Sequence, residues 1–200
     1  MALNKTVYYI IYKPFQVLCQ FSKEENKKTL ADFFDIEKDV YPVGRLDYDS
    51  EGLLILTNDK QLNHRLLNPL FKHKKEYWVQ VDGAINNDAI IKLQQGVTIN
   101  VDGKLYKTKP AIAKLFLAEP NVSVRFPPIR FRKDIPTSWI SLTLTEGKNR
   151  QVRKMTAAVG YPTLRLIRHS IENIFLDKMQ AGEIIELSKA SIYKNLFNEN

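Results

Sequence analysis

Cysteine and long apolar runs are almost absent from this chain of 200 residues. Cys19 is the single cysteine, so neither an intrachain disulfide nor a zinc site built from several thiolates can form. The apolar run near the N-terminus, residues 7–12, is too short for the hydrophobic core of a signal peptide or for a membrane span. The sequence therefore predicts a cytoplasmic protein with no membrane partner.

Histidine is also scarce, and no glycine-rich phosphate loop is present. His64, His73 and His169 are scattered along the sequence and pair with no cysteine and no consistent acid. A zinc centre or a nucleophile–histidine–acid triad is therefore not expected. The sequence offers no recognisable site for ATP, a metal ion or a redox cofactor, and we predict that the protein needs none.

Acidic residues are fewer than basic ones: 22 Asp and Glu stand against 30 Lys and Arg, a formal net charge of +8. This surplus favours a polyanionic partner, because each basic side chain placed on a phosphate releases condensed counterions. On charge alone, nucleic-acid binding and an indifferent basic surface are equally compatible with the sequence. The hydrophobic share of 44% is that of ordinary globular proteins, and the length fits one domain or one domain of two lobes.

Hydrophobic periodicity predicts strands and helices in mixed order. Ile140, Leu142 and Leu144 alternate with the side chains between them, which is the two-residue period of a half-buried strand at residues 139–145. Further strands are predicted at residues 7–12, 52–57 and 76–81, and helices at about residues 59–67, 88–95 and 149–158. Because these elements do not alternate strictly, we predict an α+β fold with a mixed, largely antiparallel central sheet flanked by helices.

Capping and turn residues predict the boundaries of several elements. Asn58 is the expected N-cap of the helix at residues 59–67, with Gln61 at the capping-box position. Gly96 and Gly160 follow the second and third helices, where glycine commonly ends a helix. Residues 97–108 are typical of a β-hairpin with a primed Asp-Gly turn.

Residues 119–136 combine four prolines with four basic side chains. Proline prevents regular structure there, and the basic residues share no helical face. Two interpretations stay open. The segment is either a solvated surface loop or an RNA-contacting loop in which Phe126 and Phe131 stack on bases.

Three carboxylates, Asp47, Asp49 and Glu51, lie in a glycine-flanked turn just before a predicted strand. Their spacing matches the start of a calcium-binding loop, but position 12 is Asn58 instead of glutamate and a strand follows in place of a helix. A magnesium-dependent phosphoryl-transfer site is a further alternative, although no second acidic cluster accompanies the turn. For Asp49, Ser50 and Glu51 we expect a structural role in satisfying turn amides.

Four separated motifs together cover nearly the whole chain. They are Tyr12-Lys13-Pro14 with Val17-Leu18, Gly44-Arg45-Leu46-Asp47 through Asn58, Lys75-Glu76-Tyr77-Trp78-Val79, and Thr145-Glu146-Gly147-Lys148-Asn149-Arg150-Gln151-Val152-Arg153-Lys154-Met155. The motifs resemble the RsuA-like family of RNA pseudouridine synthases, and the second and fourth are long and specific. The resemblance implies an isomerase that converts uridine to pseudouridine in RNA without a cofactor, with a catalytic core of two lobes around a cleft.

Most relatives in that family carry an RNA-binding S4 domain ahead of the core, whereas here the core begins almost at Met1. We therefore expect residues 1–200 to form a single catalytic domain without an N-terminal S4 domain. This feature, together with residues 127–130 and 135–139, resembles the RluE subgroup, which modifies large-subunit ribosomal RNA. The resemblance implies 23S ribosomal RNA or a pre-ribosomal particle as the partner, and a monomer is the simplest state for such a core.

The same resemblance implies roles for particular side chains. Asp47 is the expected catalytic residue, either as a nucleophile at C1′ or as a base at C2′. Tyr77 is expected to stack on the uracil, possibly exchanging a proton through its hydroxyl, and Leu144 to pack under it. Arg153, with Arg150 in reserve, is the expected guanidinium that keeps Asp47 ionised.

Other basic residues are expected to contact the substrate. Arg45 is expected to hold a phosphate or to help open a helix, and Lys75, Arg130 and Arg132 are further candidates. Lys72, His73, Lys74 and Lys75 are interpreted as a basic rim, extended by Arg165 and Arg168. The main rival function is a non-catalytic RNA-binding module, which would share the basic charge but would not need Asp47.

Overall fold

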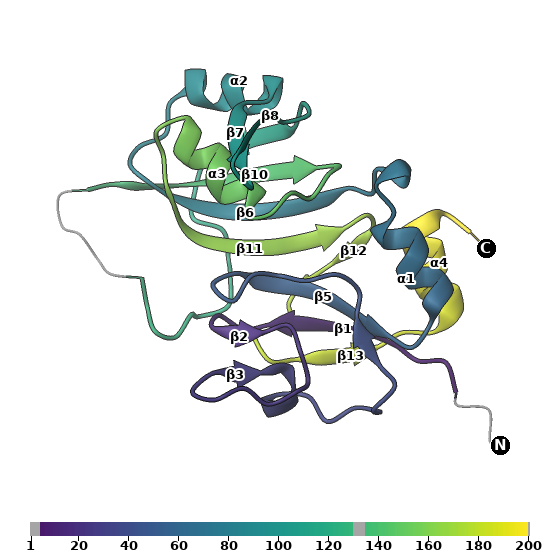
Figure 1. The fold of residues 1–200 in the computed structure, drawn as a ribbon. Helices are drawn as coiled ribbons and strands as arrows, with labels where there is room; N and C mark the ends of the chain where they lie inside the picture. The colour runs from purple at the N-terminus through teal and green to yellow at the C-terminus, as the bar shows by residue number, and fades with distance from the viewer. Residues whose placement is uncertain (1–4, 130–134, 200) are drawn as a thin grey trace. The chain divides into compact units, whose positions relative to one another are not determined.

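The computed structural model describes residues 5–129 and 135–199, and the chain divides into two compact units (Figure 1). Unit 1 contains the residues up to His73 together with those from Ser170 onward, and unit 2 contains residues 74–169. Each unit has its own hydrophobic core. The middle of the chain therefore forms one core, and its two flanks form the other.

The sheet of unit 1 is built around β1 (Tyr8–Lys13). This strand pairs antiparallel with β5 (Glu51–Thr57) on one side and with β13 (Ile184–Glu186) on the other, and β4 (Tyr41–Pro42) adds to β5. All seven residues of β5 are buried, as expected for an apolar run whose two faces are both covered. The strands predicted at residues 7–12 and 52–57 are confirmed.

Short elements and two helices complete unit 1. A parallel pair joins β2 (Val17–Leu18) to β3 (Lys28–Thr29), and a 3-10 turn, η1 (Leu30–Asp32), follows. The helices are α1 (Lys60–Leu67) and α4 (Lys189–Phe197), with a second 3-10 turn, η2 (Pro69–Phe71), after α1 and a short strand, β12 (Ile174–Phe175), before α4. The core beside β1 and β5 combines side chains of these two strands with others from the residue before β1, from β2, from η1 and from the loop after η1: Val7, Ile11, Val17, Leu30, Phe34, Val40, Leu54 and Leu56.

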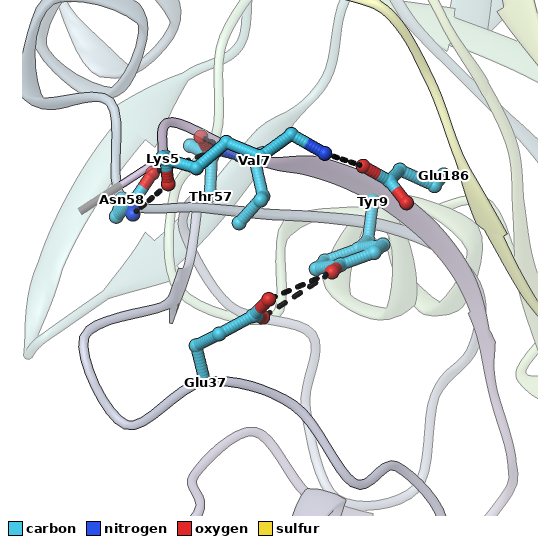
Figure 2. Close-up of polar contacts among 7 residues, drawn as sticks. All are labelled: Lys5, Val7, Tyr9, Glu37, Thr57, Asn58 and Glu186. Atoms are coloured by element: carbon cyan, nitrogen blue, oxygen red, sulfur yellow. Dashed lines mark hydrogen bonds and ion pairs between the residues drawn. The ribbon is translucent and has the colours of Figure 1, made fainter.

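The N-cap of α1 is Asp59, so the prediction of Asn58 is wrong. One carboxylate oxygen of Asp59 accepts hydrogen bonds from the amides of Gln61 and Leu62, at 2.9 and 3.1 Å. Asn58 is engaged elsewhere: its side-chain oxygen accepts the Val7 amide at 3.0 Å, which ties the start of β1 to the end of β5 (Figure 2). A side chain that bridges two strands cannot also cap the helix that follows it.

Asp59 also links the two helices of unit 1 to β1. Its second carboxylate oxygen accepts the hydroxyl groups of Tyr8 on β1 and Tyr193 on α4, at 2.7 and 2.8 Å. Burial and the hydrogen bond to Asp59 raise the pKa of Tyr193 to about 12. Because one carboxylate serves a cap and two tyrosines, it holds α1 and α4 against the sheet.

Unit 2 contains a second group of antiparallel strands with helices on one face. Strand β10 (Thr137–Leu144) pairs with β6 (Lys75–Asp82) and β9 (Ile112–Leu115), and β11 (Thr163–Ile171) lies beside β6. Helices α2 (Asn87–Gln95) and α3 (Gln151–Ala158), with the hairpin of β7 (Thr98–Val101) and β8 (Lys104–Lys107), lie on one side of β6 and β10 (Figure 1). The predicted hairpin is confirmed, with its turn at Asp102 and Gly103 in left-handed backbone.

The alternation predicted for residues 139–145 is confirmed. Ile140, Leu142 and Leu144 are buried in the core with Val152 and Met155 of α3. Helix α3 begins at Gln151, two residues later than predicted, because Arg150 adopts a left-handed conformation with φ of 53° and serves as its N-cap. The two residues before it therefore belong to a loop.

Residues 119–129 and 135–136 form neither helix nor strand, which confirms the prediction for the described part of the proline-rich segment. Arg130, Phe131 and Arg132 lie outside the described residues. Arg165 and Arg168 are only 7% and 5% exposed on β11, so the prediction that they extend a basic surface rim is wrong. Arg165 instead donates a hydrogen bond to the Ser123 carbonyl at 2.7 Å and so binds the segment to the strand.

The fold is α+β with mostly antiparallel strands, as predicted. None of the helices in the described part of the chain is long and apolar enough to cross a membrane.

Candidate active site

The Asp47 turn connects β4 to β5 in unit 1. Gly44 begins it in left-handed backbone, with φ of 73°, and a Cβ added there would approach Cδ2 of Leu67 to 3.0 Å. The Asp47 carbonyl accepts the Ser50 amide at 3.0 Å, which closes the turn just before the buried strand β5. Asp47 is half-buried and Arg45 is exposed. The Asp47 carboxylate is thus held on a short, sterically restricted loop.

Two of the acidic turn's residues differ from expectation. The Ser50 hydroxyl is buried and makes no hydrogen bond, so the prediction that it satisfies a turn amide is wrong. Glu51 is 1% exposed and already part of β5, whereas it was expected in the turn. The difference at Glu51 arises because β5 begins one residue earlier than predicted.

Lys13 is a buried cation of this site that the sequence analysis did not single out. Its side chain is 0% exposed, and its ammonium group donates to the carbonyls of Pro14 and Val17 at 2.8 and 2.7 Å. Burial lowers the pKa of Lys13 to about 8, while the nearby charges of Cys19, Glu51, Asp49 and Asp47 oppose that shift. In the sequence, the burial of Lys13 was indicated only by its place at the end of an apolar strand and directly before proline.

The Cys19 thiol also supports the Asp47 turn. Its sulfur accepts the amide N–H of Leu46 at 3.2 Å, one residue before Asp47. Leu46 itself is buried. The turn is therefore fixed by a contact to sulfur at Leu46, by a backbone hydrogen bond at Ser50, and by packing at Gly44.

A second group of candidate residues lies in unit 2. Tyr77 of β6 is half-buried and packs against the core with Val79, as its alternation predicted. In the register of β6 and β10, Leu142 is opposite Tyr77 and Leu144 is opposite Lys75. Tyr77 and Leu144 are therefore diagonal neighbours on one face of the sheet, within reach of each other.

Two of the predicted arginines lie at the start of α3. Arg150 is exposed at the left-handed N-cap position, and Arg153 is half-buried one turn into the helix. Val152 and Met155 face the core, so α3 has the apolar stripe that the sequence predicted. The structure thus brings Tyr77, Leu144 and the α3 arginines into the same unit.

Glu146 organises this loop, although the sequence analysis gave it no role. Its carboxylate accepts the Tyr106 hydroxyl at 2.6 Å, the Lys109 amide at 2.9 Å and the Gln151 side-chain amide at 2.6 Å. Burial alone would raise the pKa of Glu146, but these hydrogen bonds outweigh it and hold the pKa below its ordinary value. Gln151 in turn accepts the Lys148 amide at 2.9 Å. Hydrogen bonds of Glu146 and Gln151 therefore hold both ends of the loop that presents Arg150.

The basic rim is confirmed only in part. Lys72 and Lys74 are exposed, and Lys75 is half-buried. The prediction that His73 belongs to the rim is wrong, because His73 is half-buried and its Nδ1 lies 3.0 Å from a carboxylate oxygen of Glu172. This pair could not be predicted from the sequence, since His73 and Glu172 are far apart along the chain.

His169 of β11 stacks on the ring of Trp78 of the neighbouring strand β6, with the two ring centroids 3.7 Å apart. Among the described residues, no group of three or more His, Cys, Asp and Glu could hold a metal ion. Asp47 belongs to unit 1 and Arg153 to unit 2, and the ion pair expected between them stays a prediction.

Comparison with known proteins identifies the family of this chain. The RNA pseudouridylate synthase family matches residues 7–158. The ribosomal large subunit pseudouridine synthase E of Vibrio parahaemolyticus is 48% identical over 178 residues, 89% of this chain and 72% of that protein. The protein of the same name from Xanthomonas axonopodis pv. citri is 49% identical over 172 residues, 85% of this chain and 88% of that protein.

A solved structure of a pseudouridylate synthase superposes with a TM-score of 0.77 at 26% identity, covering 98% of this chain and 76% of that one. Its fold is the one described above, and the family match spans the Asp47 turn, Tyr77 and the whole of α3. This chain belongs to the RNA pseudouridylate synthase family.

Proposed function

We propose that this protein isomerises a uridine of large-subunit ribosomal RNA to pseudouridine, with Asp47 as the catalytic residue and without a cofactor. The observation that carries the proposal is the Asp47 turn, a half-buried carboxylate fixed at the entrance of a fully buried strand. The names of the Vibrio and Xanthomonas relatives support the large subunit as the source of the RNA. The net charge of +8 suits a polyanionic substrate. We further propose that it acts in the cytoplasm as a monomer and a single catalytic domain.

The reaction exchanges one glycosidic bond for another. The N1–C1′ bond breaks, the freed uracil turns, and a C5–C1′ bond forms, while C5 loses its proton and N1 gains one. Atoms and electrons balance without an oxidant, a reductant or a nucleotide cofactor. The protein must therefore hold the base outside its stack, retain the detached uracil and stabilise an electron-poor sugar carbon.

Asp47 acts in its ionised form, either by attacking C1′ or by removing the proton at C2′. Lys13 is close enough for the two charges to interact. In the proposed complex Arg153 supplies the second positive group, since it is half-buried on the side of α3 next to the apolar stripe.

Tyr77 and Leu144 hold the uracil ring in this proposal. Their diagonal placement on β6 and β10 offers an aromatic ring and an aliphatic side chain on one face, which suits a planar base. Arg45, Arg150 and Lys75 contact phosphates. Arg130 and Arg132 are assigned to the RNA by their charge in the sequence alone.

The test is tritium release from large-subunit ribosomal RNA labelled at C5 of uridine, with a metal chelator present. We expect the wild type to release tritium and Asp47→Asn to release none, although it still binds the RNA. Asp49→Asn is the matched control, because Asp49 is a half-buried carboxylate of the same turn, and it should keep most of the activity. Mapping the product RNA by primer extension after carbodiimide treatment identifies the modified position.

Other outcomes would point elsewhere. RNA binding without tritium release from any variant would favour a non-catalytic RNA-binding module. Equal loss of activity in the two variants would mean that the turn matters as a structure and that Asp47 has no special role. Activity that the chelator abolishes would contradict a cofactor-free reaction.

A further inference from the structure

Two links of the chain connect unit 1 to unit 2, and they differ in structure. One follows His73 and the other precedes Ser170. The second link lies inside β11, which continues through it as a regular strand. The first link is irregular, because residues 72–74 form neither helix nor strand and Lys72 adopts left-handed backbone with φ of 53°. A hinge movement would therefore take place at the first link, where backbone angles can change without breaking a strand.

A pair of side chains ties the irregular link to the end of β11. Nδ1 of His73 lies 3.0 Å from Oε1 of Glu172, the residue directly after β11, and the two side chains are only 10% and 22% exposed. An ionised carboxylate only accepts hydrogen bonds, so Nδ1 carries the proton of this contact. The pair lies within unit 1, and it joins the two segments that lead to unit 2.

The backbone at Glu172 is unfavourable for a glutamate. Its φ is 48°, in the left-handed region that residues with a Cβ rarely adopt. Glu172 and Asn173 form the two-residue turn between β11 and β12, where a positive φ favours glycine, asparagine or aspartate. A glutamate here places a carboxylate beside His73 at the cost of backbone strain, and strain of this kind is typical of positions under a functional constraint.

Aromatic contacts fix the side chains around both links. The His73 ring lies 6.0 Å from the ring of Phe71 in η2 and 5.5 Å from the ring of Phe197 in α4. On the other side of the links, within unit 2, the stack of His169 on Trp78 joins β11 to β6. The two linking segments are therefore held together by side chains in each unit.

We propose that His73 and Glu172 are positioning residues, which hold the irregular link against the end of β11 and so restrict the movement of unit 2 relative to unit 1. This inference rests on the proposed function, in which Asp47 of unit 1 acts together with Tyr77 and Arg153 of unit 2. Groups that act together from two units need a restricted link, because a misplacement of about 1 Å can cost about a hundredfold in rate. Neither positioning residue touches the substrate in this proposal.

The first test measures kcat and KM by tritium release for Glu172→Gly and His73→Ala. Glycine suits left-handed backbone, so Glu172→Gly removes the carboxylate without adding strain. We expect kcat to fall by about tenfold or more in both variants, while KM stays within about twofold, because the side chains proposed to bind the RNA are unchanged. His73→Asn should restore most of kcat, since its side-chain amide places an N–H donor near the position of Nδ1.

Asp177→Gly is the matched control. Asp177 is an exposed acidic residue of unit 1 that also has left-handed backbone, with φ of 45°. Its replacement by glycine changes the charge and the backbone freedom in the same way as Glu172→Gly, but it leaves the pair with His73 intact. We expect wild-type kcat and KM.

The second test follows the two units directly and needs no activity. Spin labels are attached to Asn63→Cys on α1 and Lys92→Cys on α2, both exposed positions, in protein in which Cys19→Ser removes the native thiol. Double electron–electron resonance then gives the distribution of distances between the two labels. We expect both variants of the pair to broaden this distribution, and Asp177→Gly to leave it as in the wild type.

The outcomes separate this inference from the function on which it rests. If the wild type releases no tritium, the proposed function fails, and the distance distributions alone decide whether the pair restricts the units. The same distribution in Glu172→Gly and in the wild type would refute the restriction, whatever the activity, and this variant decides if His73→Ala fails to fold. A broader distribution with kcat within about twofold of the wild type would refute the positioning role.

Discussion

The buried ammonium group of Lys13 makes a prediction about stability that can be worked out from its pKa. Its folded-state pKa is about 8, against 10.5 for an exposed lysine. Below pH 8 the folded and unfolded chains both carry the proton, and the cost of burying the charge is fully present. Between pH 8 and 10.5 the folded chain loses the proton first, so the free energy of unfolding rises with pH. The difference of 2.5 pKa units corresponds to about 3 kcal/mol.

The measurement is urea unfolding from pH 7 to 10 for wild type, Lys13→Met and Lys60→Met. Lys13→Met loses two hydrogen bonds to carbonyls, a cost that does not depend on pH, and it removes the titration. The stability of the wild type relative to Lys13→Met should therefore increase as the pH rises above 8. Lys60 is exposed, so Lys60→Met should follow the wild type at every pH. A difference between wild type and Lys13→Met that is constant or falls with pH would refute the reasoning.

Three further predictions concern other contacts. Glu146→Ala leaves three donors without their acceptor and should lower the stability by about 2 kcal/mol. It should also lower kcat, because Glu146 organises the loop before α3, and Glu146→Gln should lose less of both. Full kcat in Glu146→Ala would contradict the role of Glu146. Hydrogen bonds outweigh burial and lower the pKa of Asp59. The stabilisation by Asp59 is therefore present above about pH 4 and is lost as the pH falls through the folded-state pKa. Asp59→Asn should remove about 2 kcal/mol of stability at pH 7 and make the melting temperature less dependent on pH in acid, and an unchanged dependence would count against the argument. With about four to six phosphate contacts, a plot of the logarithm of the RNA association constant against the logarithm of salt concentration should have a slope of about −3 to −4. A slope near zero in filter binding would exclude a mainly electrostatic interface.

Most elements of the sheet core could be predicted from the sequence because their signals are local. The alternation of Ile140, Leu142 and Leu144 specifies a strand and its buried face by itself. The Asp102-Gly103 turn is equally local, since few other residues tolerate left-handed backbone at both positions. In such cases neighbouring residues contain all the information needed.

The parts that could not be predicted depend on partners far away in the sequence. Asn58 and Asp59 are both good N-caps, and the choice between them is made by Val7, Tyr8 and Tyr193. The burial of Arg165 likewise depends on a carbonyl in a distant loop. For the site, Asp47 could be found from its motif.

Lys13 shows the limit of sequence reasoning most clearly. Its position in the first motif was visible, but a lysine is normally exposed, and only the packed structure shows a side chain with no solvent contact. Glu146 is a similar case, because its three donors come from β8, from a loop and from α3. Motifs identify such residues without giving their physical role.

The division of the chain into one continuous unit and one split unit has a consequence for biosynthesis. Residues 74–169 are contiguous, so unit 2 can fold as soon as it leaves the ribosome. Strand β1 precedes this unit in the sequence, but its edge partner β13 and the Tyr193 contact to Asp59 follow it. The nascent chain must therefore carry the Asp47 turn on an incomplete sheet until residues 184–193 have been made. The sheet that supports Asp47 is completed only when that segment has docked.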